Sequence, residues 1–486
     1  MFPNHWFRVL ATCAVVALCA MPAHAQKGWQ NPGSWDMFTA NLERNGFIVT
    51  PGDAIKLDPI GEYCEGRFPN ALYANFGAPY TAAAIKPSPR FPQGLPDEVQ
   101  DIALELPVFR LAPDEAIVLV GLTPPPEAYF SYQIYLATRK FSEGSLPELL
   151  LNSLGDTVNI QTINTIGPDR FQRPMVLIFT ADQRTDDRIR AALLRAGYPA
   201  SIINTIVVPS ATLKLGFERG SDTFLIANRN ALWVNKDAGE AYVDNPTFRV
   251  VRLTPAVEAA LDPFPAPPLR VRGTGQTEID LTPKLAKLRE SILEHYEALG
   301  YTATEYITKT VANEGYDFTE RQVTTLGDTR DALYLGAGNL PEFDLTDDLT
   351  LKEGEFLIAY GLNHMATGKA TYVNLNSYTS GPSKMALGSA YPSDLAGSAY
   401  QYPGADGELT YAYKISRDCE EGEDYCMPVK VPVDGCTNKD GSEILTDDSP
   451  LGVIFRIYLE PITSIGAAFP EVVYDKLIKF TPVGGP

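Results

Sequence analysis

The sequence predicts an α+β protein with predominantly antiparallel sheets and a few packed helices. Apolar and polar residues alternate along runs such as 132–135 and 455–459, as they do in strands with one buried face. The apolar fraction of 45% over 486 residues can supply the cores of two or three domains. We therefore expect sheets to dominate the fold, with helices packed against them.

A repeated order of elements predicts two related halves. In each half a helix ends at a glycine and leads into a strand. A Glu-apolar-Gly-Leu strand, an aromatic-rich alternating run and a glycine turn follow. The paired segments are 34–49 with 282–311, 115–122 with 355–362, and 129–136 with 372–378. This order indicates an internal duplication, although a chance match between common strand patterns would look the same.

Capping residues locate two of the helices. Ser34 can cap a helix that carries Trp35, Phe38 and Leu42 on one side. The clearest helix of the chain follows Thr282, which can cap it, and ends before Gly300.

One segment departs from the antiparallel pattern. Residues 174–180 form an unbroken apolar strand, Thr185 can cap a helix over 186–196, and residues 206–208 resemble another strand. This order predicts a strand–helix–strand unit whose two strands are parallel and buried on both faces.

A proline-rich stretch separates the predicted halves. Four of the seven residues in 262–268 are prolines, which lack an amide hydrogen and exclude a helix or a central strand. We expect an N-terminal half over 26–262, a linker over 263–281, and a C-terminal half with a disulfide loop over 282–486.

The first 25 residues predict a secretory signal peptide. A basic start at Arg8 precedes an apolar run over 9–21, and Ala23 and Ala25 are the small residues that a cleavage site needs. The run is too short to anchor the chain in a bilayer. We expect an exported protein without membrane insertion, either periplasmic or extracellular.

Cysteine usage agrees with export. Cys64, Cys419, Cys426 and Cys436 follow the predicted signal peptide, and an even number outside the cytosol indicates disulfides. Three of the four lie close together in sequence, which favours one local bridge with Cys64 taking the remaining cysteine. Three pairings stay open. A zinc site would need CxxC spacing or nearby histidines, and neither is present.

The net charge of −20 argues against nucleic acid as a partner, because such binding needs clustered basic residues. The same excess of acid favours neutral or cationic ligands. The sequence lacks HExxH, GxSxG, SxxK, GxxxxGK[ST] and a GxGxxG after a strand. We therefore expect no cofactor and no metal.

A repeated Leu-Gly-Asp-Thr supplies the first candidate site residues, Asp156 and Asp328. Two facing carboxylates could act as general acid and general base at the junction of the halves. Ordinary turns would use the same residues, since glycine permits the turn and aspartate bonds its own backbone.

Tyrosines on one predicted strand supply a second set of candidate site residues. Tyr129 and Tyr135 are six residues apart and share a face, whereas Tyr132 points to the opposite side. With Arg139 they could hold a sugar, an aromatic ligand or an anion. Packing within a sheet is the alternative.

Two further candidates lie in loops. His364 follows an apolar strand and could transfer protons, or could be structural. The acidic segment 434–443 has oxygen ligands for calcium, but Cys436 and Lys439 favour a disulfide-pinned surface loop.

These observations predict an exported protein that binds a neutral or cationic small molecule or glycan between two halves. Two alternatives are a metal-independent hydrolase or lyase and a structural or interaction module of the envelope. The residues to test for catalysis are Asp156, Asp328, Tyr135, Arg139 and His364. A pocket with a buried, perturbed carboxylate favours an enzyme, and one lined by aromatics without it favours a binding protein. The oligomeric state stays open.

Overall fold

The computed structural model describes residues 33–103, 106–258, 260–311 and 314–484. The predicted signal peptide lies outside these residues. Within them the predicted α+β class is confirmed, with three sheets that are antiparallel except for two strand pairs. None of the described helices is long and apolar enough to cross a membrane.

One ten-stranded sheet builds the N-terminal half, in the order β5-β4-β9-β2-β1-β10-β3-β7-β8, with β6 paired to β4. Its strands are β1 (Phe47–Leu57), β2 (Tyr80–Ala84), β3 (Ala116–Leu122), β4 (Glu127–Arg139), β5 (Glu148–Ser153), β6 (Val158–Asn159), β7 (Pro174–Thr180), β8 (Ile203–Val207), β9 (Thr223–Trp233) and β10 (Phe248–Pro255). The first residues of β1 pair with β10 and its last with β2, so β1 joins two parts of the sheet. Side chains of both parts, such as Ile117 and Phe130, share one core.

Two sheets build the C-terminal half, in the orders β11-β21-β15-β18-β19 and β12-β13-β20-β16-β17, with β14 paired to β13. Their strands are β11 (Tyr301–Tyr306), β12 (Lys309–Thr310), β13 (Ala332–Leu340), β14 (Leu345–Thr346), β15 (Phe356–Leu362), β16 (Tyr372–Thr379), β17 (Ala386–Ala390), β18 (Thr410–Ser416), β19 (Cys426–Pro428), β20 (Leu451–Tyr458) and β21 (Lys476–Pro482). Leu357 of β15 and Phe455 of β20 belong to the core that the two sheets share.

The strand orders of the two halves correspond. The order β1-β10-β3-β7-β8 matches β11-β21-β15-β18-β19, and in both cases only the last pair is parallel. The order β1-β2-β9-β4-β5 matches β12-β13-β20-β16-β17. Glu115 and Glu355, just before β3 and β15, each accept hydrogen bonds from a threonine on the last strand of their half. This agreement accords with the duplication, which stays a prediction.

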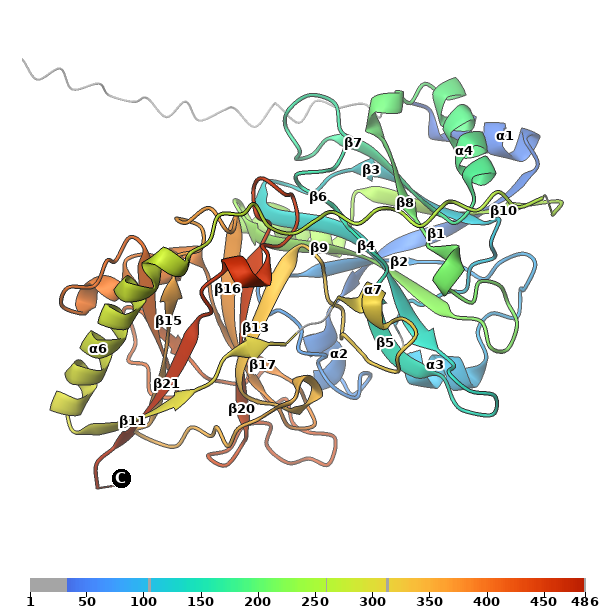
Figure 1. Cartoon of the computed structure of the whole chain (residues 1–486). Coiled ribbons are helices and arrows are strands. Elements are labelled where there is room, and N and C mark those ends of the chain that lie inside the picture. The colour runs from blue at the N-terminus through green and yellow to red at the C-terminus, as the bar shows by residue number, and fades with distance from the viewer. Residues whose placement is uncertain (1–32, 104–105, 259, 312–313, 485–486) are drawn as a thin grey trace, which may run out of the picture.

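Helices cover the outer faces of this arrangement. Helices α1 (Trp35–Arg44) and α4 (Gln183–Arg195) pack on β3, β7 and β10, and α6 (Thr282–Ala298) packs on β15, β18 and β21. The shorter helices are α2 (Pro59–Cys64), α3 (Asp97–Ala103), α5 (Lys236–Asp244), α7 (Gly315–Phe318) and α8 (Pro392–Leu395). Figure 1 shows α1 and α4 at one end of the molecule and α6 at the other, with the sheets between them.

The helix starts confirm one predicted cap and correct two. Ser34 accepts a hydrogen bond from the Met37 amide at the start of α1, as predicted. The predicted cap Thr185 is wrong, because Asp182 caps α4 and accepts from the Thr185 amide. Thr282 is also not a cap; its hydroxyl donates to the Ile279 carbonyl. The predicted parallel pair is confirmed as β7 and β8.

The predicted linker crosses the molecule in an extended form, from β10 to α6 (Figure 1). Two disulfides are present, Cys64–Cys436 and Cys419–Cys426. The first joins the two halves, and the second is the expected local bridge. Cys436 also pins the acidic loop 434–443 to α2.

Candidate functional site

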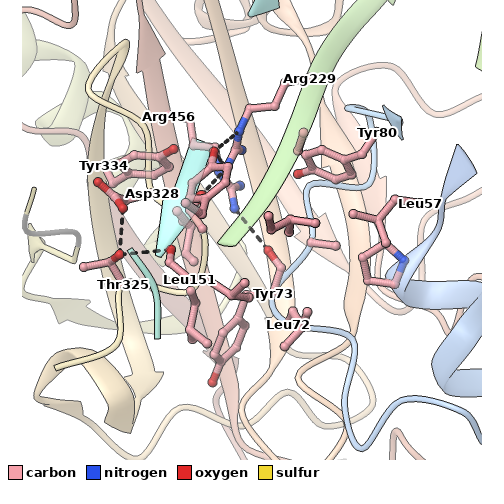
Figure 2. A pocket seen from close by; sticks show the side chains of 18 of the residues that line it. Leu57, Leu72, Tyr73, Tyr80, Leu151, Arg229, Thr325, Asp328, Tyr334 and Arg456 are labelled. Carbon is pink, nitrogen blue, oxygen red and sulfur yellow. Dashed lines mark hydrogen bonds between the residues drawn. The ribbon is translucent and has the colours of Figure 1, made fainter. Parts of the chain in front are cut away.

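A pocket of about 110 Å³ lies between the two halves. Strands β2, β4 and β9 line it from the N-terminal half, and β13 and β20 line it from the C-terminal half. Figure 2 shows Arg229, Arg456, Asp328 and several tyrosines around it. Apolar side chains from both halves supply most of the remaining wall, including Leu72, Leu151, Leu225 and Ile454.

Arg229 on β9 is buried at 8% exposure. Its Nε and Nη2 donate to the Tyr135 hydroxyl at 3.0 and 2.9 Å, and Nη2 also donates to the Gly327 carbonyl. The guanidinium lies over the Tyr80 ring, 5.4 Å from its centroid. Nη1 is left without an acceptor among the described residues.

Arg456 on β20 is buried at 6% exposure. Its Nη2 donates to the Tyr73 carbonyl at 3.4 Å, and its Nη1 has no partner among the described residues. The guanidinium lies over the rings of Tyr334 and Tyr378, at 5.8 and 5.5 Å from their centroids. A buried cation is therefore held mainly by aromatic rings.

The two arginines occupy matching positions. Tyr80 of β2 pairs with Arg229, and Tyr334 of β13 pairs with Arg456. On the other side of each arginine strand, Ser131 of β4 faces Arg229 and Asn374 of β16 faces Arg456. Each half thus presents one arginine between the same two neighbouring strands.

The tyrosines around the arginines remain neutral. Burial raises the pKa of Tyr334 well above 10, although both arginines oppose this shift. Burial likewise raises the pKa of Tyr378 to about 12, again against the charge of Arg456. These hydroxyls therefore supply no negative charge to the pocket near neutral pH.

Asp328 is the one carboxylate among the described residues that line the pocket. It accepts four hydrogen bonds, from the amide and hydroxyl of Ser153, the Thr325 hydroxyl and the Gly315 amide. It therefore joins the C-terminal half to β5 of the N-terminal half. Its oxygens are already occupied by protein donors.

The repeated Leu-Gly-Asp-Thr segments meet at this junction. Asp156 in the first copy pairs with Arg330, which follows the second copy, at 2.8 Å. Asp328 in the second copy binds Ser153, which precedes the first. Of these two predicted site residues only Asp328 lines the pocket, together with the predicted Tyr135.

Arg139 and His364 lie elsewhere. Arg139 forms a buried ion pair with Asp222 at 2.6 Å. His364 lies between Glu278 and Asp475, at 2.9 and 3.3 Å from their oxygens. Burial alone would lower the pKa of His364, but the two carboxylates outweigh it and raise it to about 10. This imidazolium is fixed in a charged cluster in the C-terminal half.

The sequence reasoning missed Arg229 and Arg456. Both interrupt the apolar face of a strand, between Ala227 and Ala231 in β9 and between Ile454 and Tyr458 in β20. A lone arginine on such a face, repeated in the strand before the last of each half, is the signal that could have found them.

The described residues contain one group of side chains close enough together to bind a metal ion. The group of Cys419, Glu423 and Cys426 is close enough to hold an ion, but its cysteines form a disulfide and offer no thiolate. In the acidic loop, Asp440 accepts from the amide and hydroxyl of Ser442.

No family model and no curated protein matches the chain. Among solved structures, it is similar to a protein from Vibrio parahaemolyticus at 11% identity and a TM-score of 0.35, covering 86% of this chain and 98% of that one. It is also similar to an uncharacterised protein from Burkholderia cenocepacia at 11% identity and a TM-score of 0.36, covering 91% and 96%.

Proposed function

We propose that this protein is an exported binding protein that holds a small molecule between its two halves. The observation that carries the proposal is the mainly apolar pocket that residues of both halves line, with two buried arginines in its wall. Pockets of this kind, apolar with a few placed polar groups, are typical of small-molecule sites. A volume of about 110 Å³ exceeds the space of a single water molecule several-fold.

Binding is favoured over catalysis by what lines the pocket. Its carboxylate, Asp328, is held by four protein donors, and each of its two oxygens already accepts two hydrogen bonds. Arg139 and His364 form ion pairs outside it. An aromatic pocket without an available acid–base pair suits a binding protein better than a hydrolase or lyase.

The envelope interaction module stays a second candidate, and its partner surface would not need this pocket. Export is part of the proposal and is supported by the two disulfides, which persist in oxidising compartments.

The test is a thermal-unfolding screen of the oxidised protein with small sugars, amines, amides and carboxylates. A ligand that binds only the folded state raises Tm. The Ala227→Leu variant places extra carbons in the pocket wall and should abolish the shift. Ala298→Leu, on the exposed end of α6, is the matched control and should keep it. A shift that survives Ala227→Leu would contradict binding in this pocket.

A further inference from the structure

We infer that the ligand is a small organic anion with an apolar body, and that Arg229 and Arg456 hold its anionic group together. The inference rests on the proposed function and narrows it to one chemical class. It departs from the neutral or cationic ligand that the net charge favours, because the side chains of this pocket carry positive charge.

The charge of the two arginines lacks a direct partner. Neither forms an ion pair with a carboxylate among the described residues, and Nη1 of each has no acceptor there. Burying an unpaired charge is costly, so buried arginines normally find a carboxylate. Such a pair is present elsewhere in this chain: Arg252 and Glu115 are both buried and form an ion pair at 2.6 Å.

The two positive charges lie in the wall of one pocket, one from each half. The Arg229 guanidinium lies over the rings of Tyr80 and Tyr135, and the Arg456 guanidinium lies over those of Tyr334 and Tyr378. Figure 2 shows Arg229 and Arg456 among the side chains that line this pocket. A carboxylate has two oxygens and can accept from an Nη1 of each half, in a charge-assisted pair of bonds.

Nearby carboxylates are occupied. Asp328 accepts its four bonds from Ser153, Thr325 and Gly315. Asp331 is fully buried and accepts from Tyr129, Thr157 and Asn159. The acceptor for the arginines must therefore come from outside the described chain.

The rest of the pocket fits an apolar body. Leu57, Leu72, Leu106, Leu151 and Leu225 line it, and the Thr325 hydroxyl beside them already donates to Asp328. A sugar would leave its hydroxyl groups without partners against these leucines, which costs binding free energy. A short-chain or aromatic carboxylate fits both the two arginines and the apolar leucine wall of the pocket.

The test compares ligands of one size and different charge. Titration calorimetry and thermal unfolding are carried out on the oxidised protein with hexanoate, hexanamide and hexylamine, and with benzoate, benzamide and benzylamine. We expect a carboxylate to bind at least about tenfold more tightly than its amide, and the amine not to bind. This series needs no variant to fold.

Arginine variants assign the binding to the pocket. Arg229→Met and Arg456→Met should each weaken carboxylate binding at least about tenfold, and Arg456→Lys should restore only part of it. The control is Arg110→Met. Arg110 is also buried without a carboxylate partner, but it lies outside this pocket.

The outcomes separate the two proposals. Equal binding of amide and carboxylate, or unchanged binding in both arginine variants, would overturn the anion inference and leave small-molecule binding intact. Binding of none of the six compounds at millimolar concentration would count against both.

Discussion

Arg229 and Arg456 occupy matching positions in the strand orders of the two halves, and both lie in the wall of one pocket. Each is opposite a tyrosine of the preceding strand in its sheet, Tyr80 and Tyr334 respectively. The guanidinium-to-ring distances match as well, 5.4 Å for the first pair and 5.8 Å for the second. The contact between the two halves therefore places two buried positive charges in the wall of one pocket.

Removing one of these charges should stabilise the ligand-free protein. Arg456→Met exchanges an unpaired buried cation for an apolar side chain of similar length. We expect its free energy of unfolding to rise by about 1–3 kcal/mol, because replacing buried charges with packed apolar groups often stabilises proteins. Urea unfolding of the dialysed protein measures this, and a clear loss of stability would contradict the view that the charge serves a ligand.

Asp328 should matter for the contact between the halves. Asp328→Asn removes the charge and leaves at least one of its four donors unsatisfied. We expect a loss of about 2–3 kcal/mol in the free energy of unfolding. Asp448→Asn, at a nearly fully exposed position, is the control and should change it by less than about 0.5 kcal/mol. If both variants are equally stable, the four bonds contribute nothing.

The His364 cluster should make stability depend on pH. The pKa of His364 is raised to about 10 from an ordinary 6.5, so its contribution is complete below pH 6.5 and is lost as the pH rises toward 10. His364→Ala leaves Glu278 and Asp475 unpaired and should cost about 3 kcal/mol or more near pH 6.

The difference between wild type and His364→Ala should shrink steadily between pH 6.5 and 10. Thermal unfolding across this range measures it. The exposed His295 provides the control, since His295→Ala should give no comparable trend. A difference that stays constant with pH would mean that His364 is not charged in the folded protein.

The two disulfides should contribute differently to the free energy of unfolding. Cys64–Cys436 spans 372 residues, whereas Cys419–Cys426 spans 7. Loop-closure entropy predicts a loss of about 6 kcal/mol for the double serine variant of the first and about 2.5 kcal/mol for the second. Unfolding of both variants in guanidinium chloride measures the two losses of free energy. A larger loss from removing the short bridge Cys419–Cys426 would contradict the prediction.

Local signals predicted the elements well. The Ser34 cap and the apolar spacing of Phe38 and Leu42 are properties of a short segment, and α1 forms there. The predicted cap of α6 was wrong because a 3-10 turn over Ile279–Leu281 leads directly into the helix, so that Thr282 is its first residue and no side chain caps it. In α4 Asp182 precedes Thr185 and takes the role of the cap.

The site was predicted only in part. Tyr135 and Asp328 were among the predicted residues and line the pocket, but Arg229 and Arg456 were not recognised. A lone arginine in a strand normally faces solvent, whereas these two are buried in the wall of a pocket that both halves line. The net charge and the pocket favour different ligands, because net charge averages over a whole surface and does not describe one cavity.

The most direct measurement is anomalous diffraction from crystals of the protein soaked with para-bromobenzoate. The account predicts a bromine peak between Leu72, Leu151 and Leu225, with the carboxylate in density between the guanidinium groups of Arg229 and Arg456. A bromine peak elsewhere on the molecule, or none at millimolar concentration, would contradict it.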